Sequence, residues 1–171
     1  MHCSMTGRPL RDHSEGIWDD GEWISWDWIN SQLADQELQE QYPHASPDVV
    51  HVFDDIVDAA QRYKDKTGRF LQIWGELGEL YAEIMFGIAR HTPGTKGSDG
   101  RLGNDWIEIK TISPEKANES TQVKRAGNFN KLLVVKISEF FEFEAKMLDR
   151  QTLGKGKGKH IKIRWQSEKE E

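Results

Sequence analysis

The first half of the chain carries apolar side chains every three to four residues, which is the spacing of helices. Three helices are predicted, over residues 27–41, 47–66 and 70–90. Pro43 ends the first, because a residue that precedes a proline avoids the helical conformation. Pro47 begins the second and Gly68 follows its end, as is typical of helix termini.

The second half alternates apolar and polar residues, which predicts strands. Strands are expected over residues 104–112, 131–138, 141–147 and 160–165, with one turn of helix at 149–153. The polar connection over 113–130 supports at most a short helix. A helix followed by a hairpin and further strands predicts an α+β fold with a mixed sheet.

At 171 residues the chain is long enough for one domain with an appendage. Residues 1–16, which include the single cysteine Cys3, and residues 167–171 are predicted to be disordered. Residues 17–68 are predicted to form an acidic, tryptophan-rich helical appendage, and residues 69–166 the core domain.

The formal net charge of −6 averages two unlike regions. Residues 14–60 hold twelve acids and no Lys or Arg, whereas residues 120–165 hold eleven bases and four acids. The basic region suits a nucleic-acid backbone even within an acidic chain. The longest aliphatic run covers only residues 132–135 and no apolar signal segment is visible, so we expect no membrane partner and a cytoplasmic location.

The helix over residues 70–90 is predicted to be almost entirely buried, because apolar and small side chains cover most of its circumference. Gly75 and Gly78 would permit another backbone to approach closely. One narrow polar stripe remains, formed by Gln72, Glu76, Glu79, Glu83 and Arg90. This stripe is either the helix's one strip of solvent exposure or part of a site.

The strand over residues 104–112 carries an unusual charged face. Side chains alternate along a strand, so Glu108 and Lys110 share one face while Ile107 and Ile109 share the other. An ordinary ion pair on a solvent-facing sheet would give the same pattern. Asp99, however, precedes Glu108 by nine residues with glycines between them, which suits a hairpin that brings the two carboxylates together.

Two converging carboxylates supply the hard oxygen ligands that hold Mg²⁺. A lysine beside the metal can orient a water molecule or stabilise charge on a phosphate. Asp99, Glu108 and Lys110 together therefore predict metal-dependent hydrolysis of a phosphodiester.

Asp99, the sequence Glu108-Ile109-Lys110 and the preceding helix with its sequence GELGE resemble the PD-(D/E)XK nuclease superfamily, which has the restriction-endonuclease-like fold. The resemblance covers about residues 71–165. It implies that Asp99, Glu108 and the carbonyl of Ile109 bind Mg²⁺, with Mn²⁺ as a substitute, and that Lys110 is catalytic. It also implies a nuclease that acts on DNA, with RNA as the alternative.

On the preceding helix, the resemblance makes Glu79 the catalytic carboxylate and leaves Glu76 as the alternative. Ser98 stands where the family has a proline, and residues 113–130 leave little room for the family's second core helix. Asp105 is a rival acid, but its offset of three from Glu108 places it on the opposite face of the strand.

Polar and basic side chains after residue 120 are candidates for contact with nucleic-acid phosphate. The candidates are Gln122, Lys124, Arg125, Lys155, Lys157 and Lys159. Lys155 and Lys157 lie between glycines, Lys159 follows a glycine, and Lys162 and Arg164 continue the basic series. A solvated flexible loop would have the same composition.

Four tryptophans lie among acids that would repel a phosphate chain. They are Trp18, Trp23, Trp26 and Trp28. Core packing, or an interface with a second copy or another protein, is expected of this segment. The alternative to a nuclease is a non-catalytic nucleic-acid-binding or assembly protein of the same fold that acts through this segment.

Overall fold

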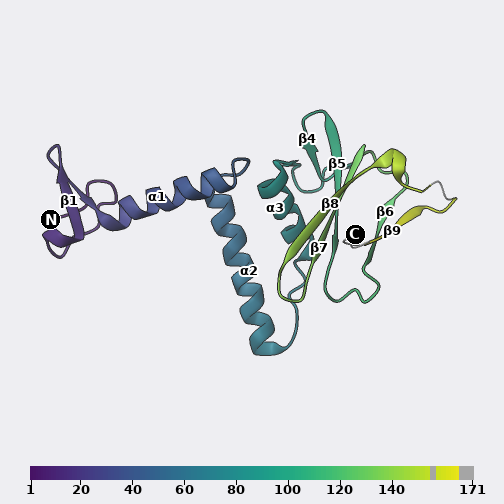
Figure 1. Ribbon diagram of the computed structural model, residues 1–171, viewed down its shortest axis with the longest axis horizontal. Coiled ribbons are helices and arrows are strands. Elements are labelled where there is room, and N and C mark those ends of the chain that lie inside the picture. The colour runs from purple at the N-terminus through teal and green to yellow at the C-terminus, as the bar shows by residue number, and fades with distance from the viewer. Residues whose placement is uncertain (155–156, 166–171) are drawn as a thin grey trace, which may run out of the picture. The chain divides into compact units, whose positions relative to one another are not determined.

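The computed structural model of the protein describes residues 1–154 and 157–165. The chain divides into two compact units, Met1–Pro47 and Asp48–Glu171. The described residues form three α-helices, a mixed five-stranded sheet and two smaller pairs of strands, so the fold is α+β as predicted (Figure 1). No helix in this part of the chain is long and apolar enough to cross a membrane.

The first unit is built on a hairpin and a helix. Strands β1 (Gly16–Asp19) and β2 (Glu22–Ser25) pair antiparallel. Asp20 and Gly21 connect them with φ angles of 44° and 88°, which is the left-handed geometry of a tight two-residue turn. Helix α1 (Trp26–Gln41) follows at once, and the Ser25 hydroxyl caps it by accepting the N–H of Trp28.

The start of the chain differs from the predicted disorder, because it packs against this hairpin. The Cys3 side chain is 1% exposed, and the N–H of Ser4 donates to the carbonyl of Trp23 at 2.8 Å. His2 and Pro9 form a β-bridge, and His13–Glu15 form a 3₁₀ turn. The bond between Ser4 and Trp23 joins residues far apart in sequence, so no local periodicity predicts it. The predicted disordered tail, 167–171, lies outside the described residues.

Helix α2 (Pro47–Thr67) lies almost wholly in the second unit, so the boundary falls near residue 47 and not at residue 68 as predicted. Helix α2 belongs to the second unit because its apolar stripe packs on the core of that unit. Ala60 is buried in the main core, and Phe53, Ile56 and Val57 pack against that core. The ring centroid of Phe53 lies 5.2 Å from that of Phe143.

The five-stranded sheet has the order β3-β4-β5-β7-β8 (Figure 1). Its strands are β3 (Ala89–Arg90), β4 (Gly100–Leu102), β5 (Asp105–Ile112), β7 (Lys131–Ile137) and β8 (Phe143–Asp149). Only β5 and β7 run parallel, and every other neighbouring pair is antiparallel.

Opposite faces of this sheet bury two different clusters. Helix α3 (Trp74–Phe86) packs on one face, where Ile107 and Ile109 meet Leu77 in the main core. The other face buries Ile112 and Val134 beneath a two-stranded ribbon of β6 (Ser120–Lys124) and β9 (His160–Arg164).

The two helical glycines differ in what lies beside them. A Cβ atom on Gly78 would overlap the Thr111 hydroxyl of β5, whereas one on Gly75 would meet nothing within 4 Å. Helix α3 therefore packs closely on the Thr111 side chain at position 78, where a larger residue would force that side chain to move.

Two predicted elements differ from those observed. The helix predicted over 70–90 ends at Phe86, because Gly87 adopts a left-handed φ of 68° and Ala89–Arg90 then joins the sheet. The connection over 113–130 contains strand β6 and no helix, since Val123 and Thr121 are buried while Gln122 and Lys124 are exposed.

Candidate functional site

The β4–β5 hairpin brings Asp99 close to Glu108. Gly100 pairs with Ile107, and the N–H of Asp99 also donates to the carbonyl of Ile107 at 3.0 Å, so Asp99 lies opposite Ile107, the neighbour of Glu108. The sequence predicted a hairpin that brings the two carboxylates together, and an oxygen of each lies within 3.4 Å of Lys110 Nζ.

Strand β4 begins at Gly100, so its backbone does not pair with β5 beyond Ile107. The Asp99 side chain covers the edge of β5 there instead. The N–H of Ile109 donates to Asp99 Oδ2 at 2.7 Å. The carboxylate is thereby held against the backbone of β5 at the point where the two strands separate.

The Lys110 ammonium lies among three oxygens that the resemblance assigned to a metal. Its Nζ is 2.7 Å from Glu108 Oε1, 2.8 Å from the carbonyl oxygen of Ile109 and 3.4 Å from Asp99 Oδ2. The Glu108 side chain is 15% exposed, against 28% for Lys110 and 29% for Asp99. Three oxygens therefore converge on one cationic centre.

The charge state of Lys110 follows from opposing effects. Burial by itself would lower the pKa of the ammonium. The hydrogen bond to Glu108 and the negative charges of Asp99 and Glu108 outweigh burial, so the pKa of Lys110 is raised. The lysine remains protonated at neutral pH.

An open cleft of about 720 Å³ lies beside α3 and reaches Asp99. The three glutamates of the α3 stripe line it together with Arg90, His91 and Ser98. Four of the five stripe residues thus face a cleft that is open to solvent.

Glu79 and Glu76 differ in their surroundings within this cleft. Arg90 pairs with Glu83 at 2.6 Å and with Glu76 at 3.7 Å, and the Glu76 side chain is 72% exposed. Burial raises the pKa of Glu79, and the negative charges of Asp99 and Glu76 add to the effect. The charges of Glu79 and Asp99 therefore interact across the cleft.

Asp105 lies apart from this group. Its side chain pairs with Lys131 at 2.8 Å and accepts a hydrogen bond from the Asn130 amide at 3.0 Å. These contacts give the carboxylate a structural role at the start of β5.

The donors present suit a hard divalent cation such as Mg²⁺. Two carboxylates and a carbonyl already surround the positive charge of Lys110, and all are oxygen ligands. Ser98 Oγ, at the edge of the cleft, is buried and lacks a hydrogen-bond partner within the described ranges. No group of three or more His, Cys, Asp or Glu side chains placed to hold a metal occurs in these ranges, so a metal would need the Ile109 carbonyl or water to complete its shell.

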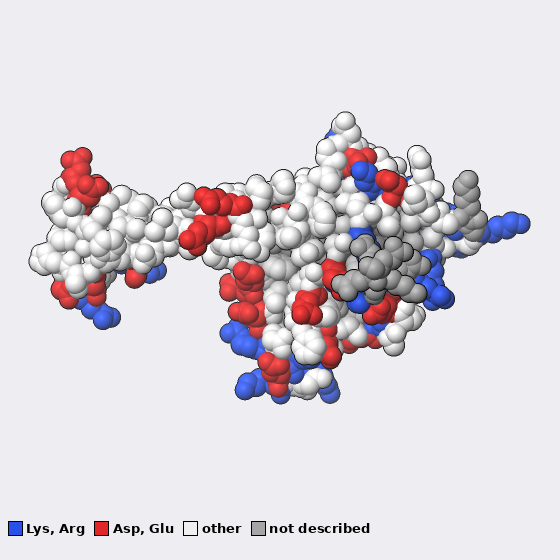
Figure 2. All heavy atoms as spheres, in the orientation of Figure 1, with Lys and Arg blue, Asp and Glu red and all other residues white. Residues whose placement is uncertain are grey.

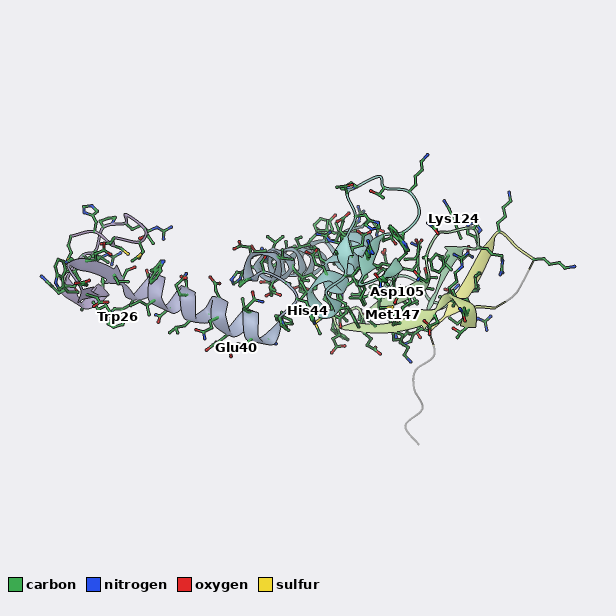
Figure 3. All side chains as sticks on the ribbon, turned by 90° about the horizontal axis from the view of Figure 1, so that it is seen from above. Trp26, Glu40, His44, Asp105, Lys124 and Met147 are labelled. Atoms are coloured by element: carbon green, nitrogen blue, oxygen red, sulfur yellow. The ribbon has the colours of Figure 1, made fainter. Side chains whose placement is uncertain are left out.

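The predicted phosphate contacts fall in three situations. Gln122 and Lys124 project from the outer face of the β6–β9 ribbon, where they pair with Lys162 and His160, and Lys124 lies toward the outer edge of the second unit (Figure 3). Lys157 and Lys159 are exposed and line a shallow pocket with Lys124. Lys and Arg side chains gather at this end of the second unit (Figure 2). Lys155 lies outside the described residues.

Arg125 makes two backbone contacts that the sequence did not predict. Its Nε donates to the carbonyl of Gly158 and its Nη1 to the carbonyl of Gly154, each at 2.9 Å. The side chain therefore connects Gly154, which follows η2 (Arg150–Thr152), to Gly158, which precedes β9, and has a structural role in addition to lining the pocket beside Lys124.

Sequence reasoning missed two residues near the cleft. His91 lines the cleft, and its Nδ1 lies 3.1 Å from the carbonyl oxygen of Ser98. Arg101 lies over the Trp106 ring at 5.6 Å on the neighbouring strands. A lone His and a lone Arg in a polar loop and a short strand carry no sequence signal of their own.

No protein-family model matches this chain, and no curated protein matches its sequence.

Proposed function

We propose that the protein is a Mg²⁺-dependent nuclease that hydrolyses phosphodiester bonds, with DNA as its main substrate. One observation carries the proposal: Asp99, Glu108 and the carbonyl of Ile109 converge on a single cationic centre at the edge of an open cleft. A structural ion pair on a sheet would not need a second carboxylate delivered from another strand, nor a cleft beside it.

The order of elements supports the resemblance to the PD-(D/E)XK superfamily. Helix α3 is followed by three antiparallel strands, β3, β4 and β5, and then by β7 parallel to β5. The departure lies between β5 and β7, where the connection holds β6 in place of a helix.

Each residue can be given a role in this chemistry. Asp99, Glu108 and the Ile109 carbonyl would hold Mg²⁺, which Mn²⁺ could replace and which supplies positive charge to the phosphate and lowers the pKa of a bound water. Lys110, kept protonated by its neighbours, stabilises negative charge that develops on the phosphate. Glu79, whose pKa is raised by burial, would take a proton from water.

The β6–β9 ribbon would supply contacts to the nucleic-acid backbone. Lys124, Lys162 and Arg164 are exposed on one side of it, and none forms an ion pair with any other described residue. Contacts of this kind position a phosphate chain and give binding that weakens with salt.

A non-catalytic binding or assembly role is the second candidate, and the first unit favours it. Helix α1 has no buried residue, and the side chains of Trp18, Trp26 and Leu33 are 59%, 43% and 54% exposed. Exposed tryptophans among acids are typical of a surface for a protein partner or a second copy of the chain.

One experiment separates the two candidates. The full chain is incubated with supercoiled plasmid, single-stranded DNA and RNA, each with Mg²⁺, with Mn²⁺ and with a chelator. We expect cleavage of DNA that requires the metal, loss of cleavage in Lys110→Ala and normal cleavage in Lys66→Ala, which removes an exposed lysine of α2. Absence of metal-dependent cleavage on every substrate would reject the nuclease, and equal cleavage by Lys110→Ala would reject the site.

A further inference from the structure

The β4–β5 hairpin carries a second rung of functional side chains beside the carboxylates. Arg101 pairs with Trp106, and each lies two residues along the chain from an acid of the candidate site, Asp99 or Glu108. Alternation along β5 places Trp106, together with its cross-strand partner Arg101, on the same face as Glu108. We propose that Trp106, with Arg101 and His91, forms a subsite that stacks on an unpaired nucleobase next to the phosphate being cut.

The Trp106 backbone is fixed on its β7 side. Its N–H donates to Asn130 Oδ1 at 2.5 Å, and its carbonyl accepts the N–H of Asn130 at 3.0 Å. The same Asn130 side chain donates to Asp105, which Lys131 also contacts. These hydrogen bonds fix the position of the backbone that carries the indole.

The indole itself is oriented by two neighbours but remains accessible. The Arg101 guanidinium lies 5.6 Å from the ring centroid, and the His91 ring meets the indole edge at 5.4 Å and 62°. Trp106 is nevertheless 41% exposed. An aromatic side chain flanked by a cation and left open to solvent is the arrangement by which proteins stack on single-stranded bases.

The spacing connects this subsite to the proposed chemistry, on which the inference rests. Two residues along a strand span roughly 6.6 Å. A phosphate held at Asp99 and Glu108 therefore brings the base of a neighbouring nucleotide within reach of Trp106. A base inside a duplex is already stacked and paired, so the indole can take only a base that is unpaired. The substrate class is a single strand, an overhang or a frayed end.

The test measures stacking without cleavage. The Lys110→Ala variant is mixed, with a chelator present, with a short single-stranded DNA that contains one 2-aminopurine, and with the same DNA as a full duplex. We expect the fluorescence of the single strand to be quenched on binding and the duplex to bind more weakly. Adding Trp106→Leu should weaken binding of the single strand about 5-fold to 150-fold and abolish the quenching.

Two further variants keep this result interpretable. Trp106→Phe retains an aromatic face and should keep part of the affinity and quenching, while Trp18→Leu removes a more exposed tryptophan of the first unit and should change neither. Unchanged binding and quenching in a folded Trp106→Leu variant would overturn the proposal, as would equal quenching of 2-aminopurine in the duplex. Since no metal or cleavage is involved, these outcomes are independent of whether the protein proves to be a nuclease.

Discussion

The N–H of Ile109 donates to Asp99 Oδ2 at 2.7 Å, so the carboxylate serves the backbone of β5 as well as the candidate metal site. Substitutions of Asp99 can separate these two roles. Asp99→Asn keeps an oxygen that can accept the bond, and we expect the melting temperature to change little while metal-dependent cleavage is lost. Asp99→Ala also removes the acceptor and should lower the free energy of unfolding by about 1–2 kcal/mol.

Denaturant unfolding and a plasmid-cleavage assay on both variants check this. An Asp99→Asn variant that still cuts would show that the carboxylate charge is dispensable. Equal stability of the two variants would show that the bond to Ile109 contributes nothing.

The Lys110 ammonium contacts the same oxygens that would bind a metal, so the two cations compete. Lys110→Met removes the resident charge and nearly preserves the volume. We expect Mn²⁺, measured by calorimetry, to bind this variant about tenfold more tightly than the wild type, because a neighbouring positive charge is gone. Cleavage should nevertheless be lost.

The matched control is Lys66→Met on α2, which should alter neither quantity. Weaker Mn²⁺ binding by Lys110→Met than by the wild type would mean that the lysine helps to hold the metal and does not compete with it.

The sequence predicted the geometry of the hairpin well, because strand alternation and glycine positions are local. Glu108 and Lys110 form an ion pair, and the glycine-containing hairpin brings Asp99 to the same ammonium. The extent of α3 was predicted less well. A helical pattern continues in the sequence to residue 90, but Gly87 takes a left-handed conformation and the chain enters the sheet.

The remaining misses depend on contacts that no local pattern encodes. Arg125 was predicted to contact phosphate, and its bonds to the carbonyls of Gly154 and Gly158 were not foreseen. Only the fold brings these carbonyls to its guanidinium. Cys3 looked disordered, because its partner Ser25 is 22 residues away in sequence. The acidic stripe of α3 was visible in the sequence. The cleft beside it was not, because the loop between β3 and β4 forms its other wall.

Gly78 should be the most sensitive small residue of α3. Gly78→Ala places a methyl group against the Thr111 hydroxyl, and we expect a loss of about 1–3 kcal/mol in the free energy of unfolding. Gly75→Ala is the matched control on the same helix. Nothing lies within 4 Å of its new Cβ, so it should stabilise the protein by about 0.4–1 kcal/mol.

Thr111→Ala removes the hydroxyl that the new methyl group would meet. Combined with Gly78→Ala, it should recover part of the loss in a double-mutant cycle followed by denaturant unfolding. Additive effects of the two substitutions would contradict the close approach of α3 to β5.

Lys124 and Arg125 are adjacent in sequence but should behave differently. Lys124 is exposed on the ribbon, so Lys124→Ala should reduce the slope of log affinity against log salt by about 0.7–0.9 for nucleic acid, with little change in stability. Arg125→Ala removes two hydrogen bonds to carbonyls and should instead lower stability by about 1–2 kcal/mol with the slope unchanged. Fluorescence anisotropy over a salt series, with thermal melts, distinguishes them, and a lower slope in Arg125→Ala would restore its predicted role in phosphate binding.

Cys3 should titrate as an unusually acidic thiol. Hydrogen bonds from Ser25 and Thr6 lower the pKa of Cys3 to about 6, and the Ser25 hydroxyl lies 3.3 Å from the sulfur. Because the pKa is lower in the folded state than in the unfolded state, the stability that the thiolate contributes is complete above the ordinary pKa of about 8.5. That stability is lost as the pH falls through about 6.

The ultraviolet absorbance of the thiolate, taken as the difference between wild type and Cys3→Ser, measures this pKa. Its midpoint should lie near pH 6 in the native protein and near the ordinary thiol pKa in denaturant. Ser25→Ala should move the native midpoint upward. A native midpoint near the ordinary thiol pKa would show that residues 1–16 are not held against the hairpin. It would support the disorder that the sequence alone predicted for this segment.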